Sequence, residues 1–167
     1  MLNFLANNRP MVTVMIQSKT AENAINTIRT AIYEGADAFG LQMCRLEPEE
    51  RKRLKDIFAS GNGRPFYITN YRYGYNEGLS DDECVKGLID GLKIGGTLAD
   101  VVGDTFDKSQ NELTTNPVAI DKQRKIIDEI HKMGKEVLIS SHLFRFVKSI
   151  SRSEEHTSEL QSHLNLV

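Results

Sequence analysis

One histidine and several other polar residues follow short apolar segments, in positions where they could perform acid–base chemistry. His142 comes after the apolar segment 136–140 and next to two serines, Ser140 and Ser141. An imidazole can accept and donate a proton near neutral pH, so His142 is the first candidate for a general acid or base. The other polar residues near the ends of expected strands are Gln42, Asn70, Arg72 and Asp104.

Other chemistries find weaker support in the sequence. Cys44 could pair with His142 as a nucleophile, although an isolated cysteine more often packs as a small buried residue. The glycine-rich segment 60–63 could cradle phosphate, but it leads into a strand and does not open a helix, so it predicts a plain turn. The first expected strand-to-helix turn, 17–20, lacks G-x-G-x-x-G. We expect no metal and no cofactor.

The elements that would position these residues alternate regularly between strand and helix. Each expected helix has a start signal: Thr20, Pro48, the capping box Ser80 to Glu83, and a start after Asn116. Apolar residues recur at helical spacing after each signal, and glycines end the segments. The expected strands are 11–16, about 36–43, 65–69, 98–102 and 136–140.

Regular strand–helix alternation predicts an α/β fold with parallel strands, either a doubly wound sheet or a TIM (β/α)8 barrel. The missing dinucleotide fingerprint weighs against the first. In the second, active sites lie at the carboxyl ends of the strands, where His142 and Arg72 are expected. A full barrel needs eight units and about 250 residues, whereas five strands are visible here. We therefore expect a partial barrel.

The composition is that of a globular protein. The chain has 167 residues, a net charge of -2 and 40% hydrophobic residues. A charge so near zero excludes a strongly basic nucleic-acid binder, and no apolar run reaches the roughly 20 residues of a membrane helix. Two cysteines are too few for a disulfide framework, and the first residues do not resemble a signal peptide. We expect a cytoplasmic protein with no nucleic-acid or membrane partner.

The last residues break the pattern. Residues 152–163 read RSEEHTSELQSH, which matches an in-frame translation of a common sequencing-library adapter. Residues 165–167 fit its continuation after a short index. We therefore interpret 152–167 as a non-native tail, disordered or a stray helix, and 1–151 as the N-terminal part of a barrel that continues in the natural protein.

The order of motifs over residues 10–146 resembles type I 3-dehydroquinate dehydratase, an aldolase-type TIM barrel. The resemblance includes Lys19-Thr20 after the first strand, residues 35–38 leading into the second, Thr69 to Arg72 at the end of the third, and Asp100 in the fourth. The most informative part is 138–144, LISSHLF, which is similar to the family's Ser-x-His-Asp-Phe at the end of strand five.

The resemblance implies loss of water from 3-dehydroquinate to give 3-dehydroshikimate, a step of the shikimate pathway and of aromatic amino acid biosynthesis. A strand-six lysine forms a Schiff base with the ketone, and a strand-five histidine moves the proton. It implies that His142 is catalytic, that Arg72 and Gln42 bind the keto-acid substrate, and that Glu77 holds His142 or lines the site. A homodimer is possible in the intact protein.

Three departures from the family pattern leave alternatives open. Gly40 and Gln42 stand where the family has Glu-x-Arg, and Leu143 stands where an aspartate usually follows the histidine. The strand-six lysine is absent, and Lys148 lies too soon after His142 to replace it. This chain alone is therefore expected to be inactive. The alternatives are another Schiff-base lyase or aldolase on the same barrel, and a non-catalytic barrel.

Overall fold

The computed structural model of the protein describes residues 4–5 and 9–142, and five strands in this part form one parallel sheet. Their spatial order follows the chain, β1-β2-β3-β4-β5. The strands are β1 (Thr13–Ile16), β2 (Ala38–Gln42), β3 (Phe66–Thr69), β4 (Leu98–Val102) and β5 (Glu136–Ser140). The α-helices are α1 (Ala21–Tyr33), α2 (Leu54–Ser60), α3 (Asp81–Ile94) and α4 (Pro117–Lys132), with 3-10 helices η1 (Met43–Arg45), η2 (Glu50–Arg53) and η3 (Gly74–Asn76).

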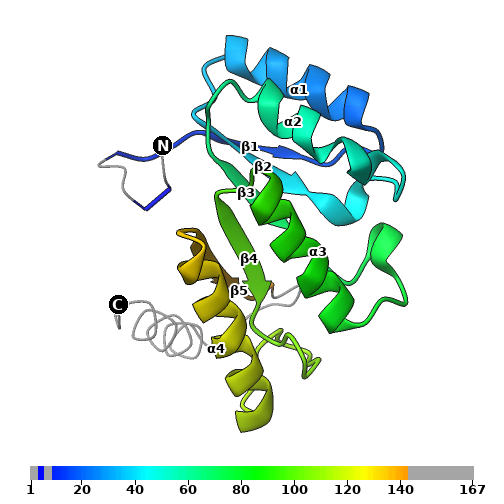
Figure 1. The fold of residues 1–167 in the computed structure, drawn as a ribbon, viewed down its shortest axis with the longest axis vertical. Coiled ribbons are helices and arrows are strands. Elements are labelled where there is room, and N and C mark those ends of the chain that lie inside the picture. The colour runs from blue at the N-terminus through cyan, green and yellow to red at the C-terminus, as the bar shows by residue number, and fades with distance from the viewer. Residues whose placement is uncertain (1–3, 6–8, 143–167) are drawn as a thin grey trace.

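This order decides between the two expected architectures. A doubly wound sheet reverses its strand order at a switch point, whereas here each strand pairs with the next along the chain. Right-handed crossovers in a constant direction place all helices on one face of the sheet. Figure 1 shows α1, α2, α3 and α4 following one another across the strands in chain order. The chain is an α/β protein with the strand arrangement of a partial barrel, as predicted.

The predicted helix starts are confirmed at three sites. Thr20 Oγ1 accepts the Asn23 amide at the start of α1, and Asn116 Oδ1 accepts the Val118 amide at the start of α4. At α3, the capping box is complete: Ser80 Oγ accepts the Glu83 amide, and the Glu83 carboxylate accepts the Ser80 amide at 2.8 Å. These bonds satisfy amides that have no partner within the helix.

The second helix differs from the expectation. The segment after Pro48 first turns as η2, and the α-helix begins only at Leu54. The Glu50 carboxylate accepts the Ala21 amide of α1 at 2.8 Å, so η2 is tied to the neighbouring helix. The first two strands are also shorter than expected, beginning at Thr13 and Ala38.

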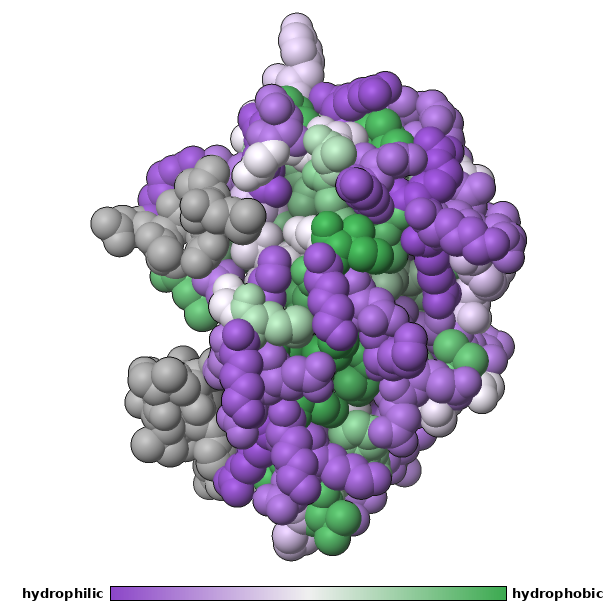
Figure 2. All heavy atoms as spheres, in the orientation of Figure 1, coloured by the Kyte–Doolittle hydropathy of each residue, from purple (hydrophilic) through white to green (hydrophobic). Residues whose placement is uncertain are grey.

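The core lies between the sheet and the helices. Alternate strand residues such as Ile16, Leu41 and Ile68 are fully buried there, and they pack against helical residues such as Ile28 and Leu92. Alternation places Tyr67, Asp100 and Leu138 on the opposite face of the sheet. At the two edge strands, that face exposes Met15 (41%) and Leu138 (39%). The helix-bearing side is mainly hydrophilic outside, with hydrophobic atoms visible between the helices (Figure 2).

The expectations about the end of the chain fall outside the described part. The tail 152–167, Leu143 and Lys148 all lie beyond residue 142. Among the residues that are described, no helix is long and apolar enough to cross a membrane.

Candidate active site

His142 lies directly after β5, where a carboxylate holds both its ring and its backbone. Glu112 Oε2 lies 2.6 Å from His142 Nδ1 and accepts the His142 backbone amide at 2.8 Å. A carboxylate can only accept at Nδ1, so this contact assigns a proton to Nδ1. Nε2 then faces Tyr71, whose hydroxyl oxygen is 3.5 Å away. The ring is oriented and remains 38% exposed.

A buried carboxylate accepts a hydrogen bond from Tyr71. Asp100, in β4, is 3% exposed, and its Oδ2 accepts hydroxyl protons from Tyr71 at 2.5 Å and Tyr67 at 2.6 Å. Burial raises the pKa of both tyrosines, and the negative charge of Asp100 raises it further. Both phenols are therefore neutral donors near neutral pH. Their donation to Asp100 fixes the Tyr71 ring, which packs edge-on against His142 with centroids 5.3 Å apart.

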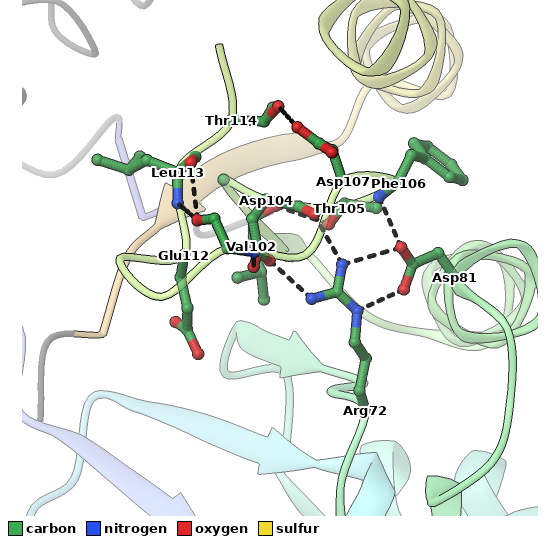
Figure 3. Close-up of polar contacts among 12 residues, drawn as sticks. Arg72, Asp81, Val102, Asp104, Thr105, Phe106, Asp107, Glu112, Leu113 and Thr114 are labelled. Carbon is green, nitrogen blue, oxygen red and sulfur yellow. Dashed lines mark hydrogen bonds and ion pairs between the residues drawn. The ribbon is translucent and has the colours of Figure 1, made fainter. Parts of the chain in front are cut away.

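Arg72 follows β3 and lies between two carboxylates. It donates from Nε to Asp81 at 2.5 Å, and from the two terminal nitrogens to Asp81 at 2.9 Å and Asp104 at 2.7 Å. A further bond of 2.8 Å reaches the Asp104 carbonyl (Figure 3). Burial lowers the pKa of Arg72, but the two carboxylates outweigh it and the net shift is upward. Four of the five guanidinium donors are thus used within the protein.

The Arg72 contacts organise the loop between β4 and α4. Asp104, only 1% exposed, also accepts the Ser109 amide at 2.7 Å, and Ser109 in turn exchanges two hydrogen bonds with Leu113. The end of this folded loop meets β5, because Ser141 Oγ donates to the Asn111 carbonyl at 2.7 Å. Glu112 is the next residue. The loop therefore carries the carboxylate that holds His142.

The other two candidates lie apart from His142. Gln42, at the end of β2, accepts a hydrogen bond from the Tyr73 hydroxyl at 3.3 Å. Tyr73 packs against Tyr71 with centroids 5.3 Å apart, so Gln42 reaches the histidine through two aromatic rings. Glu77 follows η3 and is exposed. The carboxylate at Nδ1 comes from Glu112, and not from Glu77 as the resemblance implied for one of its two roles.

Glu112 was not singled out from the sequence. It lies in a polar loop whose course depends on residues with positive φ, including Glu112 itself (φ 50°) and Phe106 (φ 74°). No local sequence pattern predicts the course of such a loop, and none predicts which strand end the loop contacts. Asp100 had one signal, a lone carboxylate inside an otherwise apolar strand.

The arrangement suits proton transfer. An imidazole whose Nδ1 is anchored to a carboxylate has a fixed orientation, and its Nε2 can accept or donate a proton. In the described part of the chain, no group of three or more His, Cys, Asp or Glu side chains is placed to hold a metal ion.

Comparison with solved structures identifies the class of fold. The structure of 3-dehydroquinate dehydratase from Enterococcus faecalis superposes with a TM-score of 0.63 and 19% identity, over 91% of this chain and 60% of that one. A putative mandelate racemase/muconate lactonizing enzyme from Sorangium cellulosum superposes with a TM-score of 0.48 and 15% identity, over 78% of this chain and 32% of that one. The chain spans about three-fifths of the length of the Enterococcus protein.

The comparisons by sequence found no match. No family model matches the chain, and no curated protein matches it significantly. The likeness in structure therefore establishes the fold, the α/β strand arrangement of a partial barrel.

Proposed function

We propose that the protein is a lyase of the 3-dehydroquinate dehydratase type, with His142 as its general acid and base. One observation carries the proposal: the Glu112 carboxylate orients the His142 ring at the carboxyl end of β5, with Nδ1 bound at 2.6 Å. The carboxyl ends of the strands are where barrel enzymes place their catalytic groups. The resemblance of 138–144 to the dehydratase strand-five motif supports the same position.

In this proposal a lysine from the strand after β5 attacks the substrate ketone and forms an iminium ion, with loss of one water. His142 Nε2 then removes a proton from the carbon next to the iminium, and the electron pair moves to the iminium nitrogen. Collapse of this enamine expels the hydroxyl group, which takes the proton from Nε2 and leaves as the second water. Hydrolysis consumes one water and releases the product and the lysine. Residues beyond 142 lie outside the described part of the chain.

We assign Arg72 a positioning role in the same site. Its charge is balanced by Asp81 and Asp104, which leaves little attraction for an anionic substrate. Its contacts hold the loop that carries Glu112. Arg72 thus acts on His142 through Asp104 and the loop.

A second candidate is a Schiff-base lyase or aldolase with a different keto substrate. It is favoured by Gln42, a neutral amide bonded to Tyr73 at the position where the dehydratase family has a charged Glu-x-Arg pair. This change alters the groups that would meet the substrate's hydroxyls. It leaves the arrangement of His142 and Glu112 untouched.

The proposal is tested on the chain extended through the next strand as encoded in the complete gene. We expect 3-dehydroquinate to give a product with the ultraviolet absorbance of a conjugated enone, and borohydride to trap a covalent adduct visible by mass spectrometry. His142→Ala should lower turnover by about 10²–10⁴-fold. His131→Ala is the matched control, because His131 is exposed in the last turn of α4.

The two candidates give different results in this assay. A trapped adduct with other keto acids, and none with 3-dehydroquinate, would favour the second candidate. If no keto acid gives an adduct, both Schiff-base functions are wrong.

A further inference from the structure

A pocket at the carboxyl ends of the first three strands combines two cations that have no ion-pair partner in the described part of the chain. It is lined by Gln17 and Lys19 after β1, Arg45 in η1, and Gly74 and Tyr75 in η3, and its volume is about 420 Å³. Pockets for small molecules generally occupy about 300–1,000 Å³. No carboxylate is among the lining residues. The pocket therefore offers hydrogen-bond donors and positive charge.

The local backbone holds one of these cations in place. Arg45 lies with its guanidinium carbon 4.9 Å from the centre of the Tyr73 ring, a cation–π contact. Gly74 has a φ of 64°, and a Cβ there would lie 2.6 Å from the Cys44 carbonyl oxygen. Only glycine allows η3 to approach η1 this closely, and the approach brings Tyr73 and Tyr75 beside Arg45. Tyr75 is held in turn by its hydroxyl bond of 3.2 Å to Glu47.

The pocket lies along the same rim as His142. From Arg45 the contacts run to Tyr73, then to Tyr71 at 5.3 Å between centroids, and from Tyr71 to His142 at 5.3 Å. Tyr73 and Tyr71 therefore lie between Arg45 and the imidazole of His142.

We propose that Lys19 and Arg45 bind the carboxylate of the keto-acid substrate. The inference rests on the proposed function for the identity of the substrate, and on the geometry for the site. It follows from the distribution of charge at this rim: Arg72 is neutralised by two carboxylates and Gln42 is neutral, whereas Lys19 and Arg45 remain available to an anion. A guanidinium and an ammonium together bind a carboxylate through charge-assisted hydrogen bonds.

The test is a binding titration on the 167-residue chain, followed by amide and arginine side-chain NMR signals. Cyclohexanecarboxylate is the probe, cyclohexanol is its neutral counterpart, and inorganic phosphate is the competing oxyanion. We expect the carboxylate to shift the signals of Arg45 and Tyr75, and cyclohexanol to shift neither. Arg45→Gln and Lys19→Gln should each lower the affinity for cyclohexanecarboxylate by on the order of tenfold.

Lys55→Gln is the matched control, because Lys55 is an exposed lysine on α2 that does not line the pocket. The inference is wrong if cyclohexanol binds as well as the carboxylate, if phosphate alone binds, or if Lys55→Gln weakens binding as much as Arg45→Gln. Binding needs no turnover, so a carboxylate site could be established even if the extended chain had no dehydratase activity. Conversely, if the extended chain keeps its full activity with Arg45→Gln and Lys19→Gln, the proposed lyase function stands and the proposed carboxylate site is wrong.

Discussion

A single carboxylate oxygen of Glu112, Oε2, contacts His142 twice, at 2.6 Å from the ring nitrogen Nδ1 and 2.8 Å from the backbone nitrogen. The double contact ties the orientation of the ring to the end of β5. It also makes the orientation of the His142 ring depend on the loop between β4 and α4, in which Glu112 lies. Changes to this region and its neighbours have four expected outcomes.

The first concerns the carboxylate itself. Glu112→Gln replaces a charged acceptor by an amide, so Nδ1 loses its strong partner and the ring exchanges between tautomers. The ¹⁵N chemical shifts of the two ring nitrogens, measured on this chain, should move towards each other. Glu77→Gln is the control and should leave both shifts in place, because Glu77 is exposed after η3. A ring that responds to Glu77→Gln and ignores Glu112→Gln would contradict the assignment.

The second concerns the Arg72 clamp, the ion pairs of Arg72 with Asp81 and Asp104. Arg72→Gln leaves Asp104, 1% exposed, without its cation, and breaking one partner of a buried ion pair costs about 3–5 kcal/mol. Urea denaturation should show a loss of this order. Because the loop then loosens, the His142 ring nitrogens should also respond, which a purely local effect would not produce.

The control for the clamp is Arg53→Gln. Arg53 pairs with Asp56 at 3.3 Å on the surface, with both side chains well exposed, and such pairs contribute about 0–1 kcal/mol. Equal losses for the Arg72 and Arg53 variants would show that the clamp contributes nothing special.

The third uses two glycines with similar backbones and different surroundings. Gly74 and Gly78 both have positive φ, 64° and 87°, but only at Gly74 does an added Cβ meet backbone, the Cys44 carbonyl at 2.6 Å. Gly78→Ala should cost about 1–2 kcal/mol from strain alone. Gly74→Ala should cost more, by urea denaturation, and should shift the NMR signals of Arg45. Equal losses at the two positions would argue against the close approach of η1 and η3.

The fourth concerns alkaline pH. Burial and the charge of Asp100 raise the pKa of Tyr67 and Tyr71 above the ordinary value of about 10. Burial raises the pKa of Tyr73 to about 12. Above pH 10 the unfolded chain releases protons that the folded protein keeps, so the stability present below pH 10 is lost as the pH rises.

Urea denaturation at pH 9 and pH 11 measures this loss directly. Tyr67→Phe removes one such phenol and should make the dependence on pH shallower. A free energy of unfolding that stays constant from pH 9 to pH 11 in the unmodified protein would refute the prediction.

The sequence predicted the elements well where a local physical signal existed. The capping box Ser80 to Glu83, the cap at Thr20 and the strands 98–102 and 136–140 were all found where the structure has them. Each depends on contacts within a few residues or on the alternation of apolar side chains. The segment after Pro48 departed from its helical pattern at η2, where Glu50 accepts a hydrogen bond from α1, a contact that no local pattern predicts.

By itself, the sequence determined the alternation of strands and helices and the position of His142 after the fifth strand. Only the tertiary structure decided which carboxylate meets that histidine, that Asp81 and Asp104 take up Arg72, and that Lys19 and Arg45 line one pocket. The physical reason is the range of the interactions. Helix caps and periodic burial are fixed within a few residues, whereas Glu112 and His142 are separated by 30 positions and meet only because a loop with positive φ folds back over the end of β5.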